Sequence, residues 1–177
     1  MNNFLLPVVL SLFSHYSDIS KSDTLLLKQT MPIESSFSSI IVYNDINLFI
    51  TEGSKNEIIT ENQNVADAIK FKVKDEILII HRRNSFLHGK IHGKIIVCVK
   101  YLHGITIMGD AEVRTIGNLN YRSLKLEIFG DGAIYANTMA TEVNTFMKGL
   151  GKIEVKGNFK NTTVNKDADG DILTTYN

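Results

Sequence analysis

The chain of 177 residues is long enough for one domain with a sizeable hydrophobic core and too short for two domains of ordinary size. Lysine plus arginine and aspartate plus glutamate number 19 each, so no net charge attracts the protein to nucleic acid or to an anionic membrane surface. A single cysteine excludes an internal disulfide framework and disfavours a cysteine-based zinc site, and the composition points to no cofactor.

The first 14 residues have the pattern of a signal peptide. A mostly apolar stretch of ten residues runs from Phe4 to Phe13, which is too short to span a bilayer and has the length of a secretory hydrophobic region. Ser14 offers a small-residue cleavage point, and no cysteine follows it directly to carry a lipid anchor. We therefore expect an exported protein without a transmembrane span, located in the periplasm, at the cell surface or outside the cell.

Residues 15–36 are predicted to be a leader or linker, because they are polar and rich in serine. The predicted single domain covers residues 37–177. Apolar residues then alternate at Ile46, Leu48 and Ile50, a turn follows at residues 53–56, and residues 57–61 return. This pattern predicts a β-hairpin.

The next segment predicts a second hairpin after one helical turn at residues 65–69. Phe71 and Val73 alternate with polar residues, residues 74–76 form a polar turn, and an apolar strand runs from Ile77 to His81. No segment carries apolar residues at helical spacing over 11 positions, so the protein is predicted to be mostly β.

Cysteine and histidine residues in the middle of the chain fit structural positions better than a metal site. Cys98 lies in the apolar run from Ile95 to Val99, where it fits as a small buried residue. His88 and His92 share one face of a strand, and His103 comes later, but no cysteine or carboxylate accompanies them at fixed spacing. A solvated glycine-rich hairpin is the better interpretation.

An internal repeat occupies residues 104–177 and is the most informative feature of the sequence. Four stretches align without gaps: 107–113 (IMGDAEV), 128–134 (IFGDGAI), 147–153 (MKGLGKI) and 166–172 (KDADGDI). The steps between them are 21, 19 and 19 residues, and alternating strands flank each one.

A repeat this short is one strand, a tight corner and a second strand, and it cannot bury its own apolar face. Stacking solves the problem, because each coil can hydrogen-bond to the next at a strand spacing of roughly 4.8 Å. We predict a short parallel β-helix, or β-solenoid, with antiparallel hairpins in its N-terminal part and right-handed crossovers. Glycine suits corners with positive φ, and a neighbouring aspartate can hydrogen-bond the turn backbone.

The sequence resembles the family of auto-transporter adhesin head GIN domains, known mainly from bacteria of the Bacteroidetes group. The resemblance rests on the repeated Gly-x-Gly-x-Ile corners, on FSSIIVYNDINLFITEG at residues 37–53 and on IIVCVKYLHGITIMGDAEV at residues 95–113. It spans about residues 33–174. The resemblance implies a stack of β-coils and an adhesin-like role, and it supplies no catalytic or ligand-binding residues.

Corner carboxylates are the candidate catalytic residues. Asp110 and Asp131 share one repeat position with Asp169, while Leu150 interrupts the series. Adjacent coils place Asp110 and Asp131 roughly 5 Å apart at the backbone, which is near the carboxylate separation of a retaining glycosidase. The alternative function is therefore a polysaccharide-acting β-helix enzyme, a glycoside hydrolase or lyase, although corner chemistry also requires aspartate.

The last corner carries the candidate metal ligands Asp167, Asp169 and Asp171. The stretch NKDADGDIL matches the first half of an EF-hand loop, but Tyr176 stands where the bidentate glutamate belongs. Alignment with the other corners favours a fourth corner over a calcium loop, so no metal is expected.

The sequence thus predicts a non-enzymatic, adhesin-like structural or binding module of the cell envelope. We expect a carbohydrate or an envelope protein as its partner, and homo-oligomerisation because the last coil leaves open strand edges.

Overall fold

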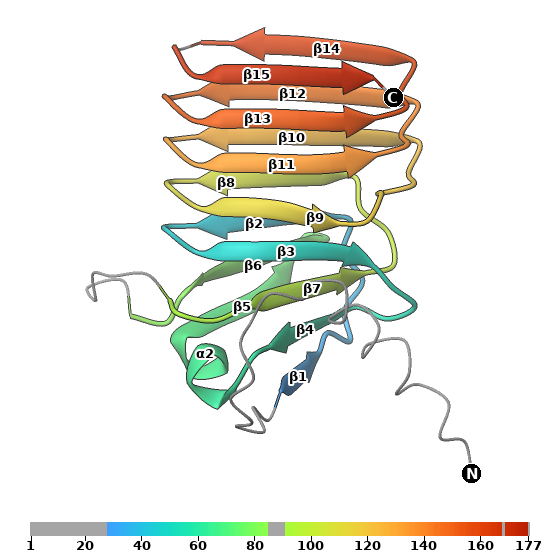
Figure 1. Cartoon of the computed structure of the whole chain (residues 1–177). Helices are drawn as coiled ribbons and strands as arrows, with labels where there is room; N and C mark the ends of the chain where they lie inside the picture. The colour runs from blue at the N-terminus through green and yellow to red at the C-terminus, as the bar shows by residue number, and fades with distance from the viewer. Residues whose placement is uncertain (1–27, 85–90, 168, 177) are drawn as a thin grey trace, which may run out of the picture.

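Two β-sheets lie face to face in the computed structural model, which describes residues 28–84, 91–167 and 169–176 (Figure 1). Sheet A contains, in spatial order, β1 (Gln29–Pro32), β4 (Glu57–Thr60), β7 (Ile95–Val99), β3 (Asn47–Glu52), β9 (Glu112–Ile116), β11 (Ala133–Thr138), β13 (Lys152–Gly157) and β15 (Asp171–Tyr176). Sheet B contains β14 (Asn161–Lys166), β12 (Glu142–Lys148), β10 (Ser123–Phe129), β8 (Gly104–Met108), β2 (Ser39–Tyr43), β6 (Ile77–Arg82) and β5 (Ile69–Lys74). The predicted all-β class is confirmed.

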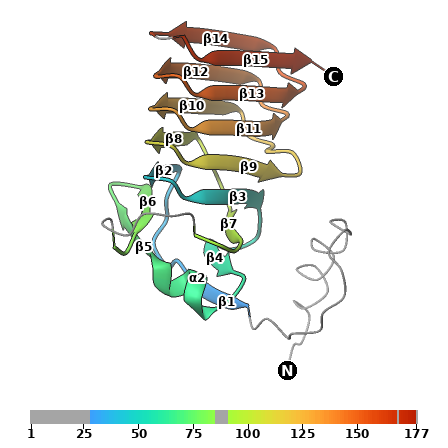
Figure 2. The ribbon, with the colours of Figure 1, turned by 60° about the vertical axis from the view of Figure 1, so that its left-hand side comes forward.

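Each coil of the stack contributes one strand to each sheet, as the view in Figure 2 makes clear. The coils β2–β3, β8–β9, β10–β11, β12–β13 and β14–β15 follow one another in space, and their strands pair in parallel. Ile128 pairs with Ile107 on one side and Met147 on the other, in the same register as the sequence repeat. The β-solenoid and the alignment of its corners are both confirmed.

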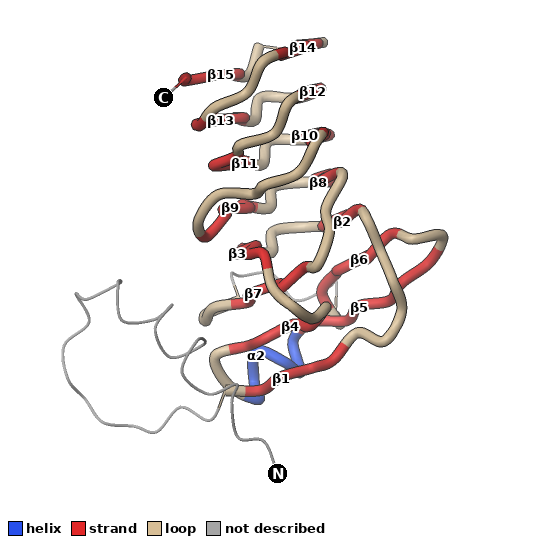
Figure 3. Tube along the Cα trace, turned by 90° about the vertical axis from the view of Figure 1, so that its right-hand side faces the viewer, coloured by secondary structure: helices blue, strands red, loops and turns tan. Residues whose placement is uncertain are grey.

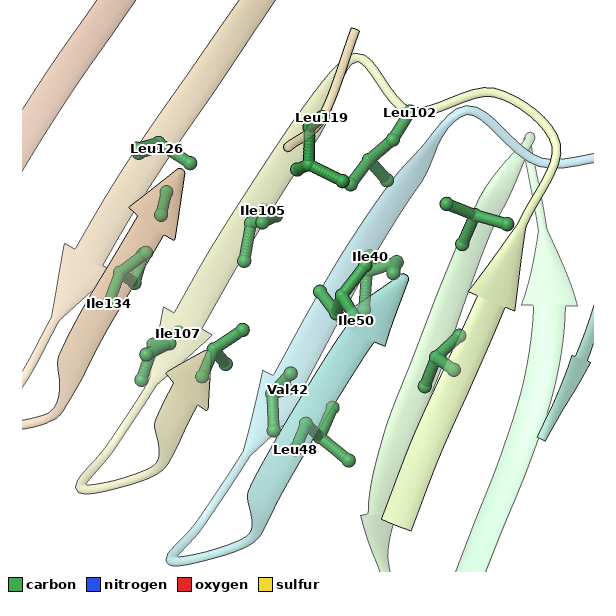
Figure 4. Packing of buried hydrophobic residues seen from close by; sticks show 14 of the residues in the cluster. Ile40, Val42, Leu48, Ile50, Leu102, Ile105, Ile107, Leu119, Leu126 and Ile134 are labelled. Carbon is green, nitrogen blue, oxygen red and sulfur yellow. The ribbon is translucent and has the colours of Figure 1, made fainter. Parts of the chain in front are cut away.

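The core is the space between the sheets, filled by every second side chain of each strand. Leu124, Leu126 and Ile128 of β10 are fully buried, and the polar residues between them face outward. Parallel registry places inward residues of successive coils above one another, so the core is a set of apolar ladders along the stack. Figure 4 shows labelled members of these ladders: Ile40, Val42, Leu48, Ile50, Ile105, Ile107, Leu126 and Ile134.

Backbone hydrogen bonds continue through the corners, which is why glycine is needed there. Gly130 donates its N–H to the carbonyl of Lys148, and its φ of 138° is a conformation that residues with a Cβ rarely adopt. Gly149 has a φ of 139°, and a Cβ added there would overlap the carbonyl oxygen of Gly130. The repeat spacing is therefore enforced by backbone contact between stacked corners.

The coil β2–β3 is a further copy of the repeat that the sequence alignment misses. Val42 pairs with Ile107 and Leu48 pairs with Val113, so the corner between them matches the first corner of the repeat. Asn44 occupies the glycine slot with a φ of 68°, the left-handed region that asparagine tolerates.

The predicted hairpin of residues 46–61 is wrong. β3 and β4 belong to the same sheet, but β7 lies between them, parallel to β3 and antiparallel to β4. The run from Ile95 to Val99 is almost continuously apolar, which suits a strand buried on both faces rather than an edge. β7 therefore lies between β3 and β4 in the sheet, although only a short turn joins β3 to β4 in the chain.

The second predicted hairpin and the helical turn are confirmed. β5 and β6 pair in antiparallel fashion, and Asp75 and Glu76 form the two-residue turn with φ values of 51° and 60°. Helix α2 (Gln63–Ala68) begins after Asn62, whose side chain accepts a hydrogen bond from the N–H of Val65.

The ordered fold begins earlier than the sequence predicts. β1 lies within the predicted leader, pairs with β4, and is followed by Ile33, which is buried in the core. The predicted signal peptide at residues 1–14 lies outside the described residues. Within the described part of the chain, no helix has the length and apolar character needed to cross a membrane.

We predict that Gly149→Ala lowers the free energy of unfolding by at least about 2 kcal/mol, because the new Cβ meets both an unfavourable φ and the Gly130 carbonyl. Urea unfolding measures the difference. Gly53→Ala is the matched control, since a Cβ there makes only ordinary contacts and should cost little. Equal stability of the two variants would contradict the role given to the corner glycines.

Candidate functional site

The corner aspartates stack along one edge of the solenoid. Asp110 and Asp131 lie at the corners of adjacent coils, as their neighbouring strands show, and both are exposed. Asp45 of the additional coil occupies the same position one coil earlier. The structure therefore brings three carboxylates into one row, of which sequence reasoning found two.

Two of these carboxylates are engaged in contacts that hold the corners. The Asp131 Oδ1 atom accepts a hydrogen bond of 2.9 Å from the N–H of Leu150 in the next corner. Both carboxylate oxygens of Asp45 accept hydrogen bonds from Arg82 Nη1, at 2.8 and 2.9 Å. The Arg82 side chain is largely buried. These contacts give the corner aspartates a structural role.

Asp167 and Asp169 lie in the last corner, between β14 and β15, and Asp171 is the first residue of β15; all three are exposed. The N–H groups of Asp167 and Asp171 donate to carbonyls of the preceding coil, so this stretch is the fourth corner that the repeat predicts. Among residues 28–84, 91–167 and 169–176, no group of three or more histidine, cysteine or acidic side chains is arranged to hold a metal ion. His92 and His103 are exposed, and His88 lies outside the described residues.

Cys98 is protonated and half-buried, rather than buried as the sequence predicts. Burial, with a smaller contribution from Glu57, raises its pKa to about 11. The thiolate that nucleophilic chemistry requires is therefore scarce at neutral pH.

The outer face of sheet A neutralises its own charges. Arg114 lies 3.9 Å from the ring centroid of Tyr135 and pairs with Glu112 at 2.6 Å. Lys152 and Lys156 bracket Glu154 at 2.9 and 2.6 Å, and these hydrogen bonds lower the pKa of Glu154 to about 2.

The outer face of sheet B instead presents uncovered apolar side chains. Tyr43, Met108 and Phe129 are in register on β2, β8 and β10, and they are 38%, 36% and 36% exposed. Phe146 of β12 lies beside them, with its ring 5.4 Å from that of Phe129. We call these four side chains the apolar row.

Hydrogen-bonding groups flank the apolar row. Glu127 accepts a hydrogen bond from Thr106 at 3.1 Å and pairs with Lys125 at 2.8 Å. Lys148 continues the line of the apolar row at the next coil, where it pairs with Phe129 in the sheet. Apolar surface and polar groups thus alternate across a flat face, an arrangement suited to an amphipathic ligand.

Sequence reasoning missed the apolar row because its members lie far apart in the chain. Tyr43 becomes a neighbour of Met108 only when the coil β2–β3 is recognised as a copy of the repeat. The signal was present in YNDINL at residues 43–48, where asparagine followed by aspartate replaces the Gly-Asp of later corners.

The family model described as "Putative auto-transporter adhesin, head GIN domain" matches residues 36–175 of the chain. This range includes every described strand of sheet B and all coils of the stack except Tyr176, the last residue of β15. No curated protein matches the sequence.

Solved structures with the same fold come from Bacteroides and Parabacteroides. A "putative adhesin" from Bacteroides fragilis has 16% identity and a TM-score of 0.53, covering 89% of this chain and 100% of its own. A "putative adhesin" from Parabacteroides distasonis has 18% identity and a TM-score of 0.59, covering 85% and 74%. A "Putative lipid binding protein" from Parabacteroides distasonis has 16% identity and a TM-score of 0.63, covering 84% and 66%.

We predict that Asp131→Ala lowers the free energy of unfolding by about 0.5–1.5 kcal/mol, since the Leu150 N–H loses its partner. Asp131→Asn should cost less, because the amide oxygen still accepts that bond. Urea unfolding of both variants tests the structural role. Equal losses for Ala and Asn would show that the hydrogen bond does not support the corner.

Because the pKa of Glu154 is lowered, we predict that part of the free energy of unfolding is lost at acid pH. Its pKa lies below the usual value of 4.5 in the folded protein, so its contribution is present above that value and is lost as the pH falls towards 2. The stability difference between the native chain and Glu154→Gln should therefore be constant above about pH 5 and shrink below it. Urea unfolding at a series of pH values measures this difference.

The matched control for this pH series is Glu142→Gln, at an exposed glutamate of sheet B. A difference between the native chain and Glu154→Gln that stays constant down to pH 2 would overturn the assignment.

Proposed function

The chain belongs to the putative auto-transporter adhesin head GIN domain family, and on this premise we propose that it is a non-enzymatic, adhesin-like binding module of the cell envelope. Its ligand in this proposal is a polysaccharide chain bound on the outer face of sheet B. The observation that carries the proposal is the apolar row of Tyr43, Met108, Phe129 and Phe146.

The chemistry of this face supports a carbohydrate. Aromatic faces carry partial negative charge and attract the polarised C–H groups on the flat side of a sugar ring. Sugar hydroxyls need donors and acceptors at the edges of that contact, and Lys125, Glu127 and Thr106 supply them beside the row.

The regularity of the face supports an extended ligand rather than a small one. Parallel pairing spaces Tyr43, Met108 and Phe129 by one strand each, roughly 4.8 Å apart along the stack. A linear polymer lying along the stack contacts several coils at once, so weak contacts add over its length.

Contacts of the corner carboxylates support the non-enzymatic part of the proposal. Asp131 is bonded to the Leu150 N–H, and Asp45 to Arg82, so both carboxylates already have partners within the fold. The apolar stretch from Phe4 to Phe13 supports export, which the contact of an adhesin with external ligands requires.

We predict that Phe129→Ala weakens polysaccharide binding roughly two- to tenfold, the worth of one aromatic contact. The measurement is retention of the full chain on a panel of purified polysaccharides, followed by titration of the strongest binder. Met139→Ala is the matched control, since Met139 is exposed and lies outside sheet B's apolar row.

Three outcomes would contradict this function. Equal loss in Phe129→Ala and Met139→Ala would place the binding elsewhere. Capture of an envelope protein with no polysaccharide retained would make the ligand a protein. Polysaccharide cleavage that Asp131→Asn abolishes would make the protein an enzyme.

A further inference from the structure

The two ends of the stack are finished differently. At the end formed by β1 and β5, helix α2 closes the space between the sheets and buries Val65 and Ala66 (Figures 1 and 3). Ile69, at the start of β5, is buried there too. Solenoids need such terminal caps because an open coil exposes the core.

The opposite end, formed by β14 and β15, has no helix over it among the described residues; Tyr176 alone reaches across one side of it, to Thr162 and Phe159 (Figure 1). Val164 faces the core side of β14 but is 50% exposed, whereas Thr145, its partner in the preceding coil, is 2% exposed. Ile172 is only partly buried, whereas its partner Ile153 is fully buried. The apolar ladders of the core are therefore exposed to solvent at this end.

The backbone at this end is equally open. The N–H groups of Asn161 and Asp167 donate to the preceding coil. Because successive residues of a strand direct their N–H and C=O groups to opposite sides, those of Val164 point to the free edge of β14. The same alternation from Asp171 directs those of Thr174 outward. Both strands pair with the preceding coil over all six residues and contain no proline, and the one charged residue on their core-facing side is Lys166, at the corner end of β14.

We propose that this end binds the same end of a second copy of the chain, through a twofold axis that passes by Val164 and Thr174. These residues lie five positions before and five positions after residue 169 of the corner, so they sit across the core from one another. Because both direct their free N–H and C=O outward, each pairs with its own counterpart. β14 and β15 then each continue into an antiparallel neighbour.

A second copy fits this end better than a single peptide strand. One strand covers one edge, whereas a second copy covers both edges and the exposed core between them. The pairing about Val164 sets Thr162 opposite Lys166, and Asn161 opposite Asp167, so no like charges meet on β14. Inward side chains then face inward side chains, with Val164 at the centre of the contact and Lys166 opposite Thr162 at its outer end.

The inference goes beyond the proposed function and does not depend on it, because it concerns the ligand-free protein and another surface. Sedimentation equilibrium of the full chain over a range of concentrations should show the mass rising to that of a dimer. Val164→Lys, which sets two like charges opposite each other on the axis, should raise the dimer Kd at least about tenfold. Val164 is half exposed, so the monomer tolerates this change.

Two controls make the test specific. Thr163→Lys adds the same charge to the outer face of β14, one residue away, and should leave the dimer intact. Mixing the Val164→Lys and Val164→Glu proteins should restore a dimer, because opposite charges then meet on the axis. A native chain that stays monomeric, a dimer unaffected by Val164→Lys, or a mixture that fails to associate would each overturn the proposal.

Discussion

Parallel backbone pairing through the corners is the constraint on which the rest of the structure depends. A coil of about twenty residues cannot bury its own apolar face, so each coil is stable only when stacked on another. The stacking requires the corner of one coil to touch the backbone of the next, and glycine alone allows that at Gly130 and Gly149. Register, core ladders and surface rows all follow from this contact.

Because the coils are in register, outward side chains at equivalent repeat positions lie in rows, and the chemistry of each row depends on how the repeats differ in sequence. On sheet A, the central outward row carries Arg114, Tyr135, Glu154 and the exposed Leu173 in succession. Arg114 stacks on Tyr135, and Glu154 pairs with two lysines of its own strand. On sheet B, the same geometry sets Met108 beside Phe129, and both side chains are 36% exposed. Sheet A thus carries mostly paired charges on its outer face, whereas sheet B carries a row of exposed apolar groups, which we propose as the binding surface.

The sequence predicted the solenoid well where the repeat is local. The corners at residues 107–172 aligned without gaps, and strand pairing confirmed each of them. The step of 21 residues reflects two additional residues between β9 and β10, because Arg114 pairs with Tyr135 whereas Leu119 pairs with Thr138. Gly117, with a φ of 74°, lies in this bulge.

Prediction failed where stacking order departs from chain order. The coil β2–β3 lies between β6–β7 and β8–β9, so β7 separates two strands that a short turn connects. Local patterns carry no information about such insertion, and only the unbroken apolar run of β7 hinted at a central strand. The apolar row was hidden for the same reason, because Tyr43 and Met108 meet only through that insertion.

The most direct test of a binding face on sheet B is a crystal structure of the full chain with the oligosaccharide that binds most tightly. We expect a sugar ring over Phe129 and Met108, with its hydroxyls bonded to Glu127 or Lys125. A sugar bound on sheet A, or against the corner carboxylates of Asp110 and Asp131, would contradict it.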